Sequence, residues 1–203
     1  VPKKVAFPHL AELVTEARVF DVVAYEKLFR RLQRSKKPVF VIGNEAEGAV
    51  DAILEVAEWL NIPMVVTPHG KGLVSPYHPL FRGVVGFAGH ETSLSTLRDP
   101  AVDVVVAIGS SLGEWASNGW DTAALLNDRL VHISLSDNHF VGSLMASLHV
   151  KSCPSAVFKQ MLADLEKAQV SHKDLGVTPF PQSGGKRFHF NLDDEAACSS
   201  DQI

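Results

Sequence analysis

Residues 37–67 of the chain are KPVFVIGNEAEGAVDAILEVAEWLNIPMVVT, and this stretch decides the fold class. Residues 38–43 form a short, wholly apolar run that ends in glycine, which is typical of a strand buried on both faces of a parallel sheet. In residues 47–60, apolar side chains recur every three or four positions, as on the inner face of a helix. A second apolar run covers residues 62–67. A strand, a helix and a strand within about 30 residues predict a βαβ unit.

The same alternation continues along the chain. Residues 21–169 are expected to form one α/β domain on a parallel sheet, preceded by a connecting segment at residues 1–20. Residues 68–89 contain five glycines and three prolines, so a long functional loop is expected there. Residues 170–203 lose all periodicity and are expected to be a linker or tail. Further strands are predicted at 103–109 and 129–135, and further helices at 21–34, 90–98 and 154–167.

The composition is that of an ordinary globular domain. Of the 203 residues, 46% are hydrophobic and 21% are charged, and the formal net charge is −4. Because basic residues are not in excess, nucleic acid is not an expected partner. No apolar run approaches the length of a membrane span, and no signal peptide is expected. The first residue is Val1 rather than methionine, so we expect a piece of a longer protein.

The two cysteines, Cys153 and Cys198, are too few for a disulfide framework or a zinc pattern. Cys153 lies in an apolar stretch and is expected to be a small core residue, whereas Cys198 lies in the polar tail. The nine histidines form no H-x-x-x-H or H-E-x-x-H pattern, so no metal site is expected. This cysteine usage fits a reducing compartment, and a cytoplasmic protein is expected.

Glycine-containing segments follow three of the predicted strands, at the place where open parallel sheets bind ligands. Glycine lets backbone N–H groups approach a phosphate closely, so a nucleotide site is one hypothesis. Residues 43–48 match G-x-x-x-x-G but lack the Lys-Ser or Lys-Thr of a P-loop, and the simpler interpretation is that Gly43 only ends a strand. The three segments are Gly43-Asn44-Glu45, Thr67-Pro68-His69-Gly70-Lys71-Gly72 and Gly109-Ser110-Ser111.

Residues 109–113, GSSLG, match the G-x-S-x-G nucleophile elbow of α/β-hydrolases. Ser111 would be the nucleophile, Asp121 or Asp137 the acid, and His149 the base, in the required chain order. A nucleophile elbow leads directly into a long helix, however, and the two tryptophans, the asparagine and the glycine that follow make a poor one. A serine hydrolase is therefore a minor alternative.

Six motifs follow one another in a recognisable order: KPVFVIG (37–43), LNIPMVVT (60–67), GKG (70–72), HPL (78–80), GVVGFAG (83–89) and AVDVVVAIG (101–109). This order resembles the central domain of thiamine-diphosphate-dependent enzymes, the group that contains acetolactate synthase, pyruvate oxidase and the 2-oxo acid decarboxylases. The resemblance covers residues 22–168 and rests on the combination of motifs rather than on any one of them.

The resemblance implies a Rossmann-like, doubly wound parallel sheet of about six strands with helices on both faces. Similar domains bind FAD, ADP or no nucleotide. The resemblance assigns no catalytic and no metal-binding residue to this chain. By position, the candidate nucleotide contacts are Gly43, Asn44, Glu45, Thr67, Pro68, His69, Gly86, Phe87, Ala88, Gly89, Gly109, Ser110 and Ser111.

The chain departs from the FAD-binding pattern at three places. The first strand ends in Gly-Asn-Glu rather than in three glycines, Ser111 stands where an arginine is common, and Ser136 stands where acidic residues are frequent. An arginine binds phosphate through two parallel hydrogen bonds, which serine cannot replace. FAD, ADP and the absence of a nucleotide therefore stay open.

The resemblance also implies a place between two other domains of the same polypeptide. The preceding pyrimidine-binding domain carries an activating glutamate, and the following diphosphate-binding domain carries a Gly-Asp-Gly motif, which this sequence lacks. Thiamine diphosphate and magnesium would be bound by those domains, and the isolated chain is expected to be inactive. The full-length enzyme is expected to act on a 2-oxo acid or acyl compound as a homodimer or homotetramer. A free-standing nucleotide-binding module is the other alternative.

Overall fold

The computed structural model describes residues 19–168. The tail at residues 170–203, Cys198 and all but the end of the connecting segment at residues 1–20 lie outside this part. The elements in chain order are α2 Val22–Arg34, β1 Pro38–Ile42, η1 Asn44–Ala49, α3 Val50–Trp59, β2 Met64–Val66, η2 Pro68–Gly70, β3 Phe81–Val84, α4 Glu91–Arg98, β4 Val104–Ile108, β5 Leu130–Ser134, α5 Asp137–Phe140, η3 Val141–Ser143, β6 Leu148–Lys151 and α6 Pro154–Ala168.

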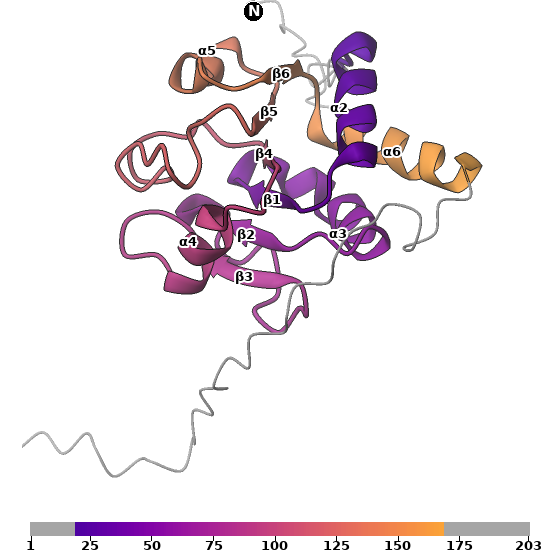
Figure 1. The fold of residues 1–203 in the computed structure, drawn as a ribbon. Helices are drawn as coiled ribbons and strands as arrows, with labels where there is room; N and C mark the ends of the chain where they lie inside the picture. Colours follow the sequence, from indigo (N-terminus) through magenta and orange to yellow (C-terminus); the bar gives the residue numbers. More distant parts are fainter. Residues whose placement is uncertain (1–18, 169–203) are drawn as a thin grey trace, which may run out of the picture.

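The six strands form one sheet in the order β3-β2-β1-β4-β5-β6, and every neighbouring pair is parallel. The central pair is in continuous register from Pro38 opposite Val104 to Ile42 opposite Ile108. Figure 1 shows α2, α3 and α6 on one side of the sheet, and α4, the β4–β5 connection and α5 on the other. The predicted Rossmann-like, doubly wound α/β fold is confirmed.

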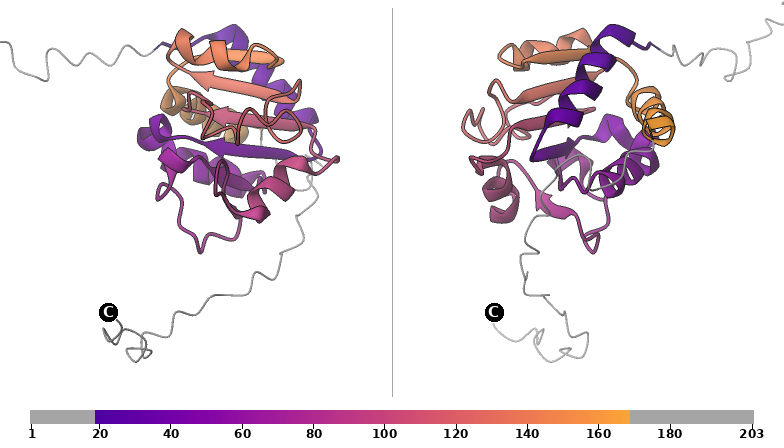
Figure 2. Two further views of the ribbon diagram at one scale, coloured as in Figure 1. Left: turned by 90° about the vertical axis from the view of Figure 1, so that its left-hand side faces the viewer. Right: turned by 45° about the vertical axis from the view of Figure 1, so that its right-hand side comes forward.

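The core consists of two layers, one on each face of the sheet, because successive strand side chains point to opposite faces. On β1, Phe40 and Ile42 face the layer under α2, α3 and α6, and the Phe40 ring meets Phe158 of α6 edge-on with ring centres 5.6 Å apart. Val39 and Val41 face the layer under α4 and the β4–β5 connection, which Figure 2 shows from the front in its left view. The four β1 side chains named above are fully buried, as the wholly apolar run predicts.

Helix α2 is capped by Asp21. The Asp21 carboxylate accepts the Ala24 N–H at 2.9 Å, and the Asp21 N–H donates to the Ser152 hydroxyl at 2.8 Å. The first contact satisfies one of the free donors at the helix end, and the second ties the helix to the end of β6. In residues 19–168, no helix has both the length and the apolar character needed to cross a bilayer.

The structure corrects three sequence-based expectations. Residues 68–89 are not all loop, because they contain β3, a partly exposed edge strand with a glycine in it. The helix expected at residues 47–60 begins as the 3₁₀ helix η1 and becomes α-helical only at Val50. Cys153 is half-buried rather than a core residue, and its thiol lies 3.2 Å from the Ser155 hydroxyl.

Candidate functional site

The strand order reverses between β1 and β4. The chain leaves β1 toward β2 on one side and leaves β4 toward β5 on the other. Such a topological switch point, beyond the carboxyl ends of the strands, is where open α/β sheets bind ligands. Two predicted segments follow these strands, so the structure brings them together at the switch point. They are Gly43, Asn44 and Glu45 after β1, and Gly109, Ser110 and Ser111 after β4.

The backbones of these two segments are joined directly. Gly43 donates its N–H to the Ile108 carbonyl at 2.8 Å, and Glu45 donates its N–H to the Gly109 carbonyl at 3.0 Å. A Cβ on Gly43 would lie 2.2 Å from the Gly109 oxygen, and a Cβ on Gly109, where φ is +61°, would lie 2.6 Å from the Ala46 nitrogen. Only glycine fits at both positions, and both glycines serve a contact between the loops.

Four of the backbone donors at the switch point are already used within the protein. Besides those of Gly43 and Glu45, the Ala46 N–H donates to the Gly43 carbonyl at 3.1 Å, and the Gly109 N–H donates to β5. Glu45 and Glu47 also place two carboxylates in the first turn of η1, where a helix terminus otherwise favours an anion. None of the predicted nucleotide contacts is Lys or Arg. These residues do not fit a nucleotide diphosphate, and their binding role stays a prediction.

The remaining predicted segments, residues 67–69 and 86–89, follow β2 and β3 along the same edge of the sheet. The Thr67 N–H donates to the Ile42 carbonyl at 2.9 Å, which fixes the end of β2 to β1. The Phe87 N–H donates to the Trp115 carbonyl at 3.1 Å, and the two aromatic rings meet edge-on with centres 5.4 Å apart. All four predicted segments therefore lie at the carboxyl edge of the sheet.

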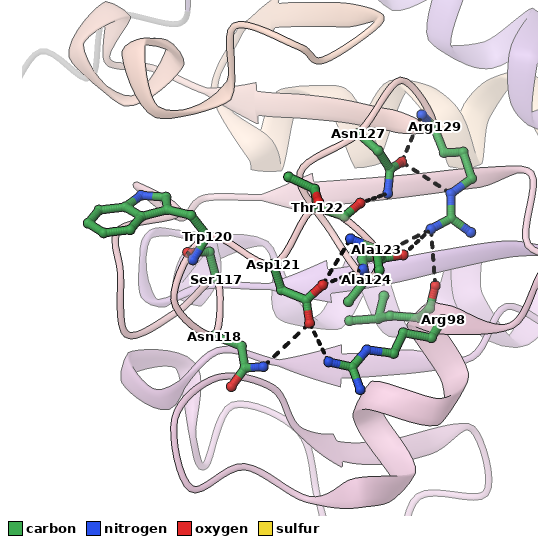
Figure 3. Close-up of polar contacts among 11 residues, drawn as sticks. Arg98, Ser117, Asn118, Trp120, Asp121, Thr122, Ala123, Ala124, Asn127 and Arg129 are labelled. Atoms are coloured by element: carbon green, nitrogen blue, oxygen red, sulfur yellow. Dashed lines mark hydrogen bonds and ion pairs between the residues drawn. The ribbon is translucent and has the colours of Figure 1, made fainter.

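The connection between β4 and β5 has no regular helix and is held in shape by Asp121 (Figure 3). Its carboxylate accepts the N–H groups of Ala123 and Ala124, both at 2.9 Å, and a guanidinium N–H of Arg98 on α4 at 2.5 Å. Burial acts to raise the pKa of Asp121, but hydrogen bonds led by that from Arg98 outweigh it and hold the pKa below its usual range. Asp121 is thus a charged anchor between the connection and α4.

Arg129 holds the other end of this connection. Its guanidinium donates to the carbonyls of Ala123 at 2.9 Å, Val102 at 3.2 Å and Leu97 at 3.3 Å, and its Nε donates to Asn127 Oδ1 at 3.1 Å. These carbonyls come from three separate segments, as Figure 3 shows in part. The planar guanidinium, with five donors, can satisfy several of them at once, so it replaces the backbone pairing that a helix would supply.

Between the switch point and these anchors, the connection presents two exposed indoles. Trp115 is 65% exposed and Trp120 is 53% exposed. Trp120 has a φ of +57°, which is rare for a bulky residue. Its backbone N–H donates to the Ser117 hydroxyl at 3.0 Å. Figure 3 shows its indole pointing away from the Asp121 cluster. The sequence shows these tryptophans in a loop but does not predict that the loop is rigidly held.

His132, in the middle of β5, is a residue that sequence reasoning missed. Its ring is fully buried, with Nδ1 2.7 Å from the Ser143 hydroxyl and Nε2 2.7 Å from the Ser110 carbonyl. Burial lowers the pKa of His132 to about 4, against the opposing effect of the Ser110 hydrogen bond. The imidazole is therefore neutral near pH 7. The one signal in the sequence is a histidine inside the otherwise apolar strand LVHIS.

Comparison with known proteins identifies the family. The family model described as the central domain of thiamine pyrophosphate enzymes matches residues 25–161, which is more than half of the chain. The chain belongs to this family. The matched range starts within α2, ends within α6 and contains all six strands, so it coincides with the sheet and its covering layers.

Relatives of this central domain include enzymes with different reactions. A putative acetolactate synthase large subunit of Mycobacterium tuberculosis is 34% identical over 90 residues, 43% of this chain and 16% of the relative. The acetolactate synthase large subunit of Cyanidium caldarium is 26% identical over 144 residues, 70% of this chain and 24% of the relative. A 3D-(3,5/4)-trihydroxycyclohexane-1,2-dione hydrolase of Clostridium perfringens is 23% identical over 144 residues, which are 70% of this chain and 22% of the relative. The chain spans about a quarter or less of the length of these relatives.

The geometry of this central domain gives no support to the serine hydrolase alternative. Ser111 is exposed and is followed by turns rather than by a helix. His149 Nε2 lies 2.9 Å from the Ser143 carbonyl, and Asp121 is engaged by Arg98. No hydrogen bond joins Ser111 to either group in the part of the chain that the structure describes. The other acid considered, Asp137, pairs with Lys151.

The described part of the central domain also contains no group of three or more His, Cys, Asp or Glu side chains that could hold a metal ion. Its acidic side chains are instead spread over separate ion pairs, such as Lys37 with Asp99 at 2.6 Å and Arg98 with Asp121.

Proposed function

We propose that this chain is the central, non-catalytic domain of a larger thiamine-diphosphate-requiring enzyme, a lyase or transferase that acts on a 2-oxo acid or a related acyl substrate. The family match over residues 25–161 carries the proposal, because it contains the whole sheet and because the relatives continue well beyond it. Residues 21–169 form the domain in this proposal. Residues 1–20 and 170–203 connect it to a pyrimidine-binding domain and a diphosphate-binding domain of the same polypeptide.

Thiamine diphosphate and magnesium bind to those flanking domains in this proposal. Two observations support it: the sequence contains no Gly-Asp-Gly, and the described residues contain no cluster of metal-binding side chains. The isolated chain is therefore inactive by this proposal, and the full-length enzyme is a cytoplasmic homodimer or homotetramer.

The contribution of the domain is architectural. The loops at the carboxyl edge are fixed to one another by backbone contacts, and Asp121 and Arg129 hold the β4–β5 connection that continues from them. These segments can therefore present a firm surface to the neighbouring domains.

The β2–β3 loop leaves this edge after Thr67 and returns to the amino end of the sheet, where the Leu80 carbonyl accepts the Met64 N–H at 2.8 Å. On this loop Lys71 is exposed and Tyr77 is 92% exposed. We place residues 70–89, from this loop through β3 to the turn after it, nearest to the substrate channel of the full-length enzyme.

An architectural role is favoured over a free-standing nucleotide-binding module. The observation that favours it is the use of the Gly43, Glu45 and Gly109 N–H groups inside the protein, together with the two carboxylates of η1. A bound FAD or ADP would have to displace these contacts or accept two nearby negative charges.

Determining the gene sequence on both sides of this segment tests the proposal. We expect a Gly-Asp-Gly motif followed by an asparagine beyond residue 203, and a glutamate-bearing domain before residue 1. The purified full-length protein should then turn over a 2-oxo acid with thiamine diphosphate and magnesium, whereas the 203-residue chain should not. A reading frame without a second or third domain would contradict the proposal.

A further inference from the structure

The segment at residues 137–146, which contains α5 and η3, exposes apolar side chains and buries a polar one. Val141 is 71% exposed, Leu144 is 77% exposed and Met145 is 42% exposed, whereas the polar Ser143 is fully buried. Surface helices normally turn their apolar side chains inward and their polar ones outward. Of the apolar side chains of this segment, only the half-buried Phe140 and Ala146 pack inward, so the three exposed ones contribute little to holding it against the sheet.

Polar contacts to the imidazole of His132 hold it instead. Nδ1 lies 2.7 Å from the Ser143 hydroxyl on η3, and Nε2 lies 2.7 Å from the Ser110 carbonyl at the switch point. A carbonyl only accepts, so Nε2 carries the hydrogen and the neutral ring accepts from the Ser143 hydroxyl at Nδ1. One buried ring thus joins the segment to the loop that follows β4.

A second histidine and an aromatic ring complete the attachment. His149 on β6 donates from Nε2 to the Ser143 carbonyl at 2.9 Å. The Phe140 ring of α5 lies against both imidazoles, with centres 5.2 Å from His132 and 4.6 Å from His149. On α5 itself, His139 Nδ1 lies 2.9 Å from the Ser134 hydroxyl. These hydrogen bonds between the inner side of the segment and the sheet thus centre on histidines and on Ser143, which two histidines share.

A proton on His132 would enter at Nδ1, on the side that faces Ser143. The ring has no contact with water, so its positive charge would be buried without a carboxylate on either nitrogen. Protonation of the neighbouring histidines would add repulsion rather than relief. The charged and titratable groups around the ring are His149 and Lys151 from β6, His139 and Asp137 from α5, and Glu45 from η1, whose carboxylate lies 3.4 Å from His139.

We propose that residues 137–146 form an acid-released flap: uptake of a proton by His132 opens the segment from the sheet and releases the loop at Ser110 with it. In the open state water can hydrate the imidazolium, whereas in the closed state the ring is buried. Acid therefore shifts the equilibrium toward the open state. This inference rests on the contacts of this chain alone and does not depend on the enzyme in which the domain works.

Hydrogen–deuterium exchange of the 203-residue chain tests the flap. The exchange of peptides within residues 135–147 is measured at pH 7.5 and pH 5 and corrected for the intrinsic pH dependence of amide exchange. From a pKa of about 4 when closed and about 6.5 when open, the opening constant should rise roughly thirtyfold between these two pH values. Peptides from β1 and α3 should show a much smaller change, because they lie in the opposite half of the fold.

Two variants separate the proton from the contacts. H132Q keeps a donor and an acceptor but does not titrate. The opening constant of this variant should therefore rise less than about threefold between pH 7.5 and pH 5. S143A removes the hydroxyl that His132 accepts from but leaves the imidazole in place. The opening constant of S143A should be roughly tenfold higher than that of the natural chain at both pH values, with the same dependence on pH. H69Q, which changes an exposed histidine on η2, is the control and should behave like the natural chain.

A flap whose corrected exchange rises no more than that of β1, or an H132Q variant that keeps the full rise, would overturn the proposal. If H132Q does not fold, nitrogen NMR of the histidine side chains in the natural chain decides. A His132 that carries its hydrogen on Nε2 and titrates together with flap opening supports the proposal, and one that titrates while the flap stays protected refutes it.

Discussion

The N–H of Glu45 donates to the carbonyl of Gly109 across 3.0 Å, and this bond closes the switch point of the sheet with the protein's own backbone. In a doubly wound fold this is the position where a ligand phosphate commonly meets backbone donors. Here the β1 loop meets the β4 loop instead. The central domain therefore keeps the architecture of a nucleotide-binding fold, while the donors at its binding position serve to join two loops.

The contact depends on glycine at position 109. We expect Gly109→Ala to lower the free energy of unfolding by about 2–4 kcal/mol, because φ is +61° and the new Cβ would lie 2.6 Å from the Ala46 nitrogen. Urea denaturation followed by circular dichroism measures this. Gly113→Ala is the matched control, since the nearest atom to its new Cβ is 3.9 Å away, and it should change stability by less than about 0.5 kcal/mol. Equal effects of the two substitutions would show that the loops do not require the close contact.

Asp121 anchors the β4–β5 connection through its charge. Asp121→Asn keeps the shape of the side chain but loses the ion pair with Arg98 and weakens the bonds from Ala123 and Ala124, so stability should fall by about 1–3 kcal/mol. Tryptophan fluorescence should change as well, because Trp115 and Trp120 lie on the loop that Asp121 holds. Asp128→Asn changes an exposed carboxylate on the same connection and serves as the control. An Asp121→Asn protein with unchanged stability and fluorescence would remove this anchor from the account.

Acid should destabilise the domain in two separate steps. The pKa of His132 is lowered to about 4 by burial, so its contribution to stability is complete above about pH 6.5 and is lost as the pH falls toward 4. The loss in that window should be about 2–3 kcal/mol and should largely disappear in H132Q. The pKa values of Asp121 and Asp164 lie below their usual range, held there chiefly by hydrogen bonds from Arg98 and Tyr25, so their contributions are lost only at still lower pH. Urea unfolding at half-unit intervals from pH 7.5 to about pH 2 would reveal both steps, and a flat profile between pH 6.5 and pH 4 would contradict the first.

The carboxyl edge should not bind a nucleotide diphosphate. Calorimetric titration of the 203-residue chain with ADP and with FAD should give no saturable heat at ligand concentrations up to about 1 mM, because the backbone donors are used and Glu45 and Glu47 repel the phosphates. The Glu45→Gln, Glu47→Gln double variant separates the two causes. Binding that appears only in this variant would identify charge as the barrier, whereas tight binding to the natural chain would refute this interpretation of the edge.

The parts of the fold that the sequence predicts well are those in which one local signal dominates. β1, β4 and β5 are recognisable because they are almost wholly apolar and are buried on both faces. α2 is recognisable from its apolar period and from Asp21 at its start. In contrast, β3 lies at the sheet edge, is partly exposed and contains Gly83, so its pairing with β2 makes it a strand more than its own sequence does. β6 is missed for the same reason.

The candidate site divides in a similar way. The positions of the loops at one edge follow from the parallel strand order, whereas the binding role that the resemblance implies for them stays a prediction. Their chemistry depends on what each group meets across the fold. Whether the Glu45 N–H faces solvent or Gly109, and whether His132 is buried between Ser110 and Ser143, is decided by contacts between segments far apart in the sequence.

The central claim is that this domain lacks a cofactor site of its own and works only beside other domains. Calorimetric titration of the 203-residue chain with thiamine diphosphate in the presence of Mg²⁺, alongside the full-length protein, tests it most directly. We predict no saturable heat for the chain and saturable binding to the full-length protein. Saturable binding of thiamine diphosphate by the 203-residue chain alone would contradict the claim.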